Sequence, residues 1–174
     1  EVAKKLGRAL APSIRRVGVF MEVKMPEIAE MVKRGVIDTV QLHAPCAFEV
    51  SEAQISELRR ATKGAELQII RAFGVSDTTL LHEAERTSAD LVLLDNPRGG
   101  SGEAFDHALL EGFARPYILS GGLTPENVAP LLERWRPWGV DVSSGIEVAG
   151  QKNRDKMIAF LKAVRMFDGE GIGR

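Results

Sequence analysis

Two turns rich in glycine and serine are the segments of this sequence best suited to bind an anion. SGGLTPEN spans residues 120–127 and SSGIE spans residues 143–147, and each follows a short apolar run. Residues without a Cβ let backbone N–H groups approach an anion closely, and hydroxyl side chains add donors. The residues of these two kinds are Gly121, Gly122, Gly145, Ser143 and Ser144. One such turn is explained by a tight strand-to-helix connection alone, but two consecutive ones favour a phosphate site. A helix expected to begin at Thr124-Pro125 would add the positive end of its dipole.

Asp95 is the acidic residue placed best for catalysis, because it ends the apolar run ADLVLLD. A carboxylate at the end of a buried strand is costly unless it is used or paired. It could act as a general acid if its proton were retained near neutral pH. It could equally cap the turn that follows it, and its position alone leaves both roles open.

Three further features accompany Asp95. The segment GGSG, with Gly100 and Gly102, predicts a loop able to fold over a ligand, or a simple turn. His43 ends the run TVQLH and is interpreted as a hydrogen-bonded wall residue of the site. Arg71 lies inside an apolar strand and needs a partner, within the barrel or at the ligand. The sequence has no cluster of histidine, cysteine and carboxylate with metal-ligand spacing, so we predict neither a metal nor a cofactor.

The elements that would position these residues recur regularly along the chain. Six apolar runs without polar alternation predict strands buried on both faces. They span residues 17–20, 39–42, 67–73, 91–95, 117–123 and 139–145. Amphipathic stretches between them predict helices that begin near Pro26, Ser51, Ser76, Thr124 and Asn153. This alternation predicts a parallel sheet with helices outside it.

Parallel strand–helix repeats form either a closed eight-stranded barrel or an open doubly wound sheet. The G-x-G-x-x-G signal of a dinucleotide-binding open sheet does not follow the first strand, and the glycines gather after the last strands, where barrels bind phosphate. We therefore predict an α/β fold, a TIM (βα)8-type barrel of which six βα units are visible. Residues 1–165 would form this single barrel domain, N-terminally incomplete, and the Gly-rich residues 166–174 a flexible C-terminal tail.

The composition of the 174 residues excludes several classes of protein. Lys and Arg number 23 against 24 Asp and Glu, so there is no basic excess for nucleic acid. No apolar run is long enough to span a bilayer, and the single cysteine, Cys46, excludes an intrachain disulfide. We expect a cytoplasmic protein with a small-molecule partner, no nucleic acid and no membrane contact; a monomer and a homodimer are both open.

With these residues in place, the chain resembles the phosphoribosylanthranilate isomerase family over almost its whole length. The segments that carry the resemblance are VQLH (40–43), ADLVLLD (89–95), GGSG-x-x-FD (99–106), LSGGL-x-PENV (119–128) and GVDVSSGIE (139–147). The resemblance implies an Amadori rearrangement of N-(5-phosphoribosyl)anthranilate, without metal or cofactor. It implies that Asp95 is the general acid, and that the glycines and serines of the two turns hold the phosphate of a phosphosugar substrate.

One departure from the family matters for activity. The family's general base is a cysteine in a K-x-CG motif on a first strand that these residues do not contain, and the sequence begins in what would be the second helix. Cys46 follows the run 39–42, which would be the fourth strand of the family's barrel. It is not expected to replace that base, because the fourth strand lies across the barrel from the first. We therefore expect the 174 residues alone to be inactive.

Two alternatives remain at this point. The chain could be another phosphosugar barrel, such as an indole-glycerol-phosphate synthase, which would need a lysine acid at a strand end; Lys63 and Lys152 are expected in loops. It could also be a non-catalytic remnant that only binds a phosphate ligand. Binding of an unreactive substrate analogue without turnover would favour the remnant.

Overall fold

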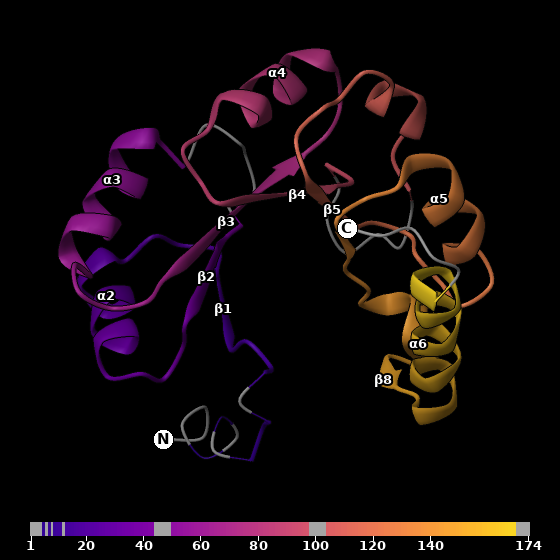
Figure 1. Ribbon diagram of the computed structural model, residues 1–174, viewed down its shortest axis with the longest axis horizontal. Helices are drawn as coiled ribbons and strands as arrows, with labels where there is room; N and C mark the ends of the chain where they lie inside the picture. The colour runs from indigo at the N-terminus through magenta and orange to yellow at the C-terminus, as the bar shows by residue number, and fades with distance from the viewer. Residues whose placement is uncertain are drawn as a thin grey trace.

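The structure is a computed structural model in which helices surround a curved sheet (Figure 1). The residues that it describes are 5, 7, 9–11, 13–43, 50–97 and 104–169. Of the expected site residues, Gly100 and Gly102 lie outside this described part, as does Cys46. Residues 166–169 of the expected tail belong to the last helix, which ends at Gly169. Residues 170–174 lie outside the described part.

Six strands alternate with helices along the chain at the predicted places, but the last two are shorter than the predicted runs and end at Leu119 and Val140. The strands are β1 (Val17–Phe20), β2 (Thr39–Leu42), β3 (Gln68–Gly74), β4 (Leu91–Asp95), β5 (Tyr117–Leu119) and β6 (Gly139–Val140). The α-helices are α2 (Met25–Lys33), α3 (Glu52–Ala61), α4 (Thr78–Arg86), α5 (Val128–Trp135) and α6 (Arg154–Gly169). Short 3-10 helices η2 (His107–Leu110) and η3 (Ser144–Ile146) and a hairpin of β7 (Glu147–Val148) and β8 (Gln151–Lys152) complete the described elements.

The six strands form one parallel sheet in the order β1-β2-β3-β4-β5-β6. The sheet curves inside an arc of helices and forms a half-barrel, so the prediction of a parallel sheet with helices outside is confirmed (Figure 1). Among the described residues, β1 pairs only with β2, and β6 pairs only with β5. Both edges of the half-barrel therefore carry unpaired backbone groups.

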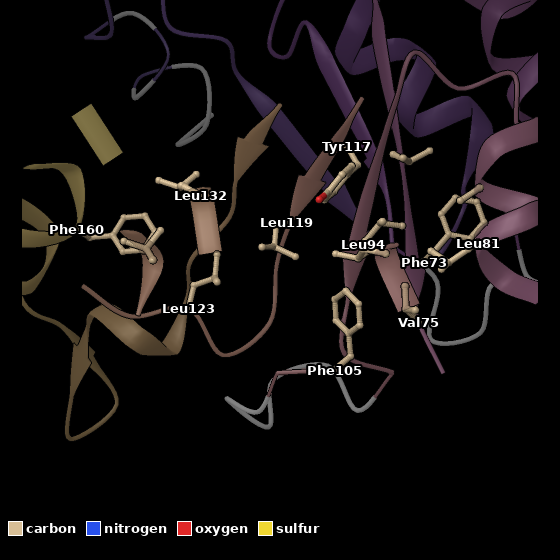
Figure 2. Packing of buried hydrophobic residues seen from close by; sticks show 14 of the residues in the cluster. Phe73, Val75, Leu81, Leu94, Phe105, Tyr117, Leu119, Leu123, Leu132 and Phe160 are labelled. Carbon is tan, nitrogen blue, oxygen red and sulfur yellow. The ribbon is translucent and has the colours of Figure 1, made fainter. Parts of the chain in front are cut away.

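The two faces of the sheet pack differently. On the outer face, Leu94, Leu119 and neighbouring strand residues pack against helix residues such as Leu132 and Phe160 in one buried cluster (Figure 2). The inner face has a smaller cluster made of strand residues only: Ile70, Ala72, Leu91, Leu93 and Ile118. Side chains alternate between these faces because successive residues of a strand point to opposite sides.

The edge strand β1 exposes its inner face. Phe20 packs against the outer core, so Val17, Val19 and Met21 point to the other side. All three are exposed, and Val19 retains 57% of its accessible surface. An apolar strand face next to an unpaired edge indicates a place where further structure would pack.

The helix starts follow local capping. Ser51 and Gln54 form the predicted capping box at the start of α3, with Gln54 N–H donating to Ser51 Oγ at 3.3 Å. The helix predicted at Ser76 begins one residue later, because Asp77 is its N-cap and accepts from Thr79 N–H at 2.8 Å. At α6, the Asn153 side chain accepts from Lys156 N–H at 3.0 Å.

Arg71 finds its partners on the outer face of the sheet, not in the barrel interior or at a ligand. Its side chain is 2% exposed and forms ion pairs with Glu52 of α3, at 3.0 Å, and with Glu83 of α4. The guanidinium also lies 4.6 Å from the Phe73 ring centroid. The reason is the alternation along β3, which turns Arg71 toward the same side as Phe73 and the helices.

Glu52 connects α3 to the next βα unit as well. Its carboxylate accepts from the Thr87 hydroxyl at 2.5 Å and from Ser88 N–H at 2.8 Å. Burial raises the pKa of Glu52, but hydrogen bonds from Ser88 and Thr87 and the charge of Arg71 outweigh burial. The pKa of Glu52 therefore lies below its ordinary value.

We predict that Glu52→Gln lowers the free energy of unfolding by about 1–2 kcal/mol at neutral pH, a range that allows for the partial exposure of this side chain. Because the folded pKa of Glu52 is depressed, its contribution is present above the unfolded pKa and is lost as pH falls through the folded value. The difference between wild type and variant should then shrink in acid. Urea unfolding at several pH values measures this, with the exposed Glu57→Gln on the same helix as control. Equal losses in the two variants would contradict it.

Candidate functional site

Four polar residues gather at one end of the inner face. Leu91 and Leu93 belong to the inner cluster, so Asp95, two residues further on, points to the same side. His43, Ser120 and Asp141 each follow a strand at that same end and continue its ladder. Their N–H groups donate to carbonyls of the neighbouring strands at 2.9 Å each. The parallel register thus brings these four residues together at the carboxyl ends of the strands, as expected for Asp95 and His43.

The Asp95 carboxylate lies against the turn that follows β5. Its Oδ1 accepts from Asn96 N–H at 2.8 Å. A Cβ at Gly121 would lie only 2.9 Å from that same Oδ1, and Gly121 has a φ of 90°, in the left-handed region. Only glycine fits there without strain. The acid and one of the expected phosphate turns are therefore in direct contact.

Asp141 is a second carboxylate of the site, and the sequence analysis did not single it out. Much of its surface is exposed, but enough protein surrounds its carboxyl group that burial raises its pKa, and the negative charge of Asp95 raises it further. The charges of His43 and Lys152 and a hydrogen bond from Ser120 act in the opposite direction, and the pKa stays above its ordinary value. Its place within the last apolar run, directly after Val140, was the available signal.

The turn at 120–127 is held by Asn127. The Asn127 side chain donates to the Gly122 carbonyl at 2.8 Å, and its oxygen accepts from Thr124 N–H at 2.8 Å. The prediction that a helix begins at Thr124-Pro125 is wrong, because α5 begins at Val128 and residues 124–127 form a turn. Asn127 precedes the helix and forms these turn contacts in place of a side-chain cap.

The turns that follow β5 and β6 touch through their backbones. A Cβ at Gly145 would lie 1.8 Å from the Leu123 carbonyl oxygen, far inside any allowed contact. Gly145 belongs to η3, next to Ser144, and Gly121 and Gly122 belong to the neighbouring turn. The structure thus joins the two predicted turns into one continuous surface.

Lys152 fixes the second turn. Its Nζ donates to the Ser143 carbonyl at 2.9 Å, to Ser143 Oγ at 3.2 Å and to Glu147 Oε1 at 2.7 Å. Lys152 was expected in a loop, but it lies in β8 opposite Glu147 of β7. The hairpin therefore turns the lysine back over the Ser143–Gly145 segment, and its positive charge also acts on Asp141.

His43 lies at the wall of the site. Its Nδ1 is 3.5 Å from Nε2 of Gln41, which is buried on the same face of β2.

Within the described part of the chain, no group of His, Cys, Asp and Glu side chains could hold a metal ion. No helix among the described residues is long and apolar enough to cross a membrane.

Comparison with known proteins identifies one family over most of the chain. The model of the family described as N-(5'phosphoribosyl)anthranilate (PRA) isomerase matches residues 1–163. The N-(5'-phosphoribosyl)anthranilate isomerase of Lactiplantibacillus plantarum is 39% identical over 157 residues, which cover 89% of this chain and 69% of that protein.

Solved structures agree with this match. The crystal structure of phosphoribosyl anthranilate isomerase from Thermus thermophilus superposes with a TM-score of 0.80 at 30% identity, covering 95% of this chain and 80% of that one. A second structure, of a phosphoribosyl anthranilate isomerase in complex with reduced 1-(o-carboxyphenylamino)-1-deoxyribulose 5-phosphate, has a TM-score of 0.74 at 30% identity. It covers 94% of this chain and 78% of that one.

We predict that Gly145→Ala lowers the free energy of unfolding by about 3 kcal/mol, because the new methyl group would push apart the two turns. Gly139→Ala is the matched control. A Cβ there meets only Ile118, at an ordinary 3.8 Å, so its cost should stay below about 1 kcal/mol. Denaturant unfolding of both variants decides the matter, and similar losses would show that the turns do not touch as described.

Proposed function

This chain belongs to the phosphoribosylanthranilate isomerase family, and we propose that it converts N-(5-phosphoribosyl)anthranilate into 1-(2-carboxyphenylamino)-1-deoxyribulose 5-phosphate. The observation that supports this best is the contact of Asp95 with the Gly121 turn. In the proposal Asp95 is the proton donor and the Gly121 turn is part of the anion-binding surface, so a bound phosphosugar would lie within reach of the acid.

In this proposal the two turns bind the phosphate group. Gly121, Gly122 and Gly145 present backbone N–H groups, and Ser143 and Ser144 present hydroxyls, while Lys152 keeps Ser143 in place. The sequence analysis also assigns Gly100 and Gly102 to substrate binding, and both lie outside the described part. His43 would form part of the wall.

The chemistry assigned to Asp95 is proton donation to the furanose ring oxygen. The bond between that oxygen and the anomeric carbon breaks, the nitrogen lone pair forms a C=N bond, and the ring oxygen becomes a hydroxyl. A base then removes the proton from C2′, which gives an enolamine that tautomerises to the ketone. We assign this base to a further strand that would close the barrel, as in the family whose first strand carries the basic cysteine. Asp141, on which the charge of Asp95 acts, would be a second carboxylate of the site.

We further propose that the half-barrel is part of an eight-unit (βα)8 barrel. The unpaired edges of β1 and β6 would each take a further parallel strand, and Val17, Val19 and Met21 would then become part of the barrel interior. Such closure would also supply the base. The expectation that the 174 residues alone are inactive follows from the same proposal.

We predict that Asp95→Asn lowers kcat at least 100-fold with little change in KM, because the acid contributes in the transition state. The assay follows conversion of the substrate by this chain extended with the N-terminal βαβα segment of the Thermus thermophilus relative, and by the chain alone. Asp155→Asn, exposed on α6, is the control and should keep full activity. Nearly unchanged turnover in Asp95→Asn would refute the assignment. Analogue binding without turnover in the extended protein would favour a binding module.

The phosphate site predicts opposite effects for two charges. Lys152→Met should weaken binding of inorganic phosphate about fivefold, and Asp141→Asn should strengthen it by a similar factor, since each change alters one partly screened charge. Because the pKa of Asp141 is raised, the difference in affinity between the wild type and Asp141→Asn should shrink toward acid as this carboxylate is neutralised. Phosphorus NMR titration measures all three, with Lys162→Met on the exposed side of α6 as control. Equal affinities throughout would place the anion elsewhere.

A further inference from the structure

A cavity of about 390 Å³ lies at the end of the strands opposite to Asp95. Its lining includes Tyr117, which begins β5, and Trp138, which directly precedes β6, whereas Ser120 and Asp141 follow the other ends of these strands. Figure 2 shows the same two ends, with Tyr117 at one end of the outer cluster and Phe105 and Val75 at the other. The cavity is therefore separate from the proposed isomerase site.

Five aromatic rings line this cavity, from β5 and the loop before it, the end of α5, the loop before β6 and the last turns of α6. They are Phe113, Tyr117, Trp135, Trp138 and Phe167. Phe113 and Tyr117 meet edge to face, with ring centroids 5.6 Å apart. The Tyr117 hydroxyl donates to the Trp135 carbonyl at 3.0 Å, which ties two of the walls together. This volume and lining are typical of pockets that bind small organic molecules.

Arg136 supplies an available positive charge at this cavity. It is exposed, it has a φ of 45°, and its side chain forms no hydrogen bond or ion pair with any residue that the structure describes. The other lining arginine, Arg115, is already engaged with the backbone carbonyls of Ala84, Thr87 and Ala89. Of the described residues, those that line the cavity include no Asp or Glu.

We propose that this cavity binds a small aromatic carboxylate, with its ring among the five aromatic side chains and its carboxylate on the Arg136 guanidinium. Aromatic rings pack favourably edge to face or offset, and a guanidinium binds a carboxylate through two parallel hydrogen bonds. A neutral aromatic compound would leave Arg136 unpaired, and inorganic phosphate would leave the rings unused. Burial raises the pKa of Tyr117 to about 12, so the phenol beside the ligand stays neutral at physiological pH.

The test uses the tryptophan fluorescence of the 174-residue chain, because its two tryptophans both line the cavity. Benzoate should give a saturable change, and benzyl alcohol, which has the ring without the charge, should bind at least tenfold more weakly. Inorganic phosphate should give no change in this signal. A benzoate response that does not saturate, or equal affinity for benzyl alcohol, would overturn the proposal.

Substitution at Arg136 locates the carboxylate. Arg136→Asn should weaken benzoate binding about tenfold, and asparagine accepts the left-handed backbone of this position, so the fold should persist. Arg136→Lys keeps the charge but loses the two parallel hydrogen bonds, so its affinity for benzoate should lie between those of the wild type and Arg136→Asn. Arg134→Asn is the matched control: this arginine lies over the outer side of Trp135, 5.1 Å from the ring centroid, and is not part of the cavity lining. Unchanged binding in Arg136→Asn, or an equal loss in Arg134→Asn, would show that Arg136 is not the ligand's partner.

Discussion

The site depends on the hydrogen-bond ladder of a parallel sheet that continues one residue beyond its strands. The N–H groups of His43, Ser120 and Asp141 each bond to a neighbouring strand, so backbone geometry and not side-chain packing sets where these residues lie. Asp95 is the last residue of its own strand, at the same end of the sheet. Because side chains alternate along a strand, a shift of one residue would turn every one of them toward the helices. The chemistry proposed for the chain therefore requires the register of the whole half-barrel.

Two glycines let the turns at the carboxyl ends of the strands approach each other and Asp95 closely. The absence of a Cβ at Gly121 lets the turn after β5 lie against the Asp95 carboxylate. The absence of one at Gly145 lets the next turn reach the Leu123 carbonyl. Lys152 then holds that turn from the hairpin side. The Asp95 carboxylate, the backbone of the two turns and Lys152 are thus brought together at the same end of the sheet.

Much of this arrangement could be predicted from the sequence. The positions of the six strands followed from short Val-, Ile- and Leu-rich runs, and Asp95 and the two turns followed from their places at strand ends. The partners of Arg71 could not be predicted, because they depend on which face of β3 points outward and on where α3 and α4 pack. Asp141 was missed because its environment comes from residues distant in the sequence. The start of α5 was misplaced because Asn127 bonds to its own turn.

The segment between α4 and β4 has a role beyond connecting them. Glu52 holds Thr87 and Ser88, Arg59 donates to the Ser88 carbonyl and to Asp90, and Ile69 N–H donates to Asp90. Arg115, which precedes β5, donates to carbonyls of the same segment. Three successive βα units thus share one short connection. Local opening there would break contacts in all three at once, so the middle of the half-barrel should exchange its amide hydrogens as one cooperative unit.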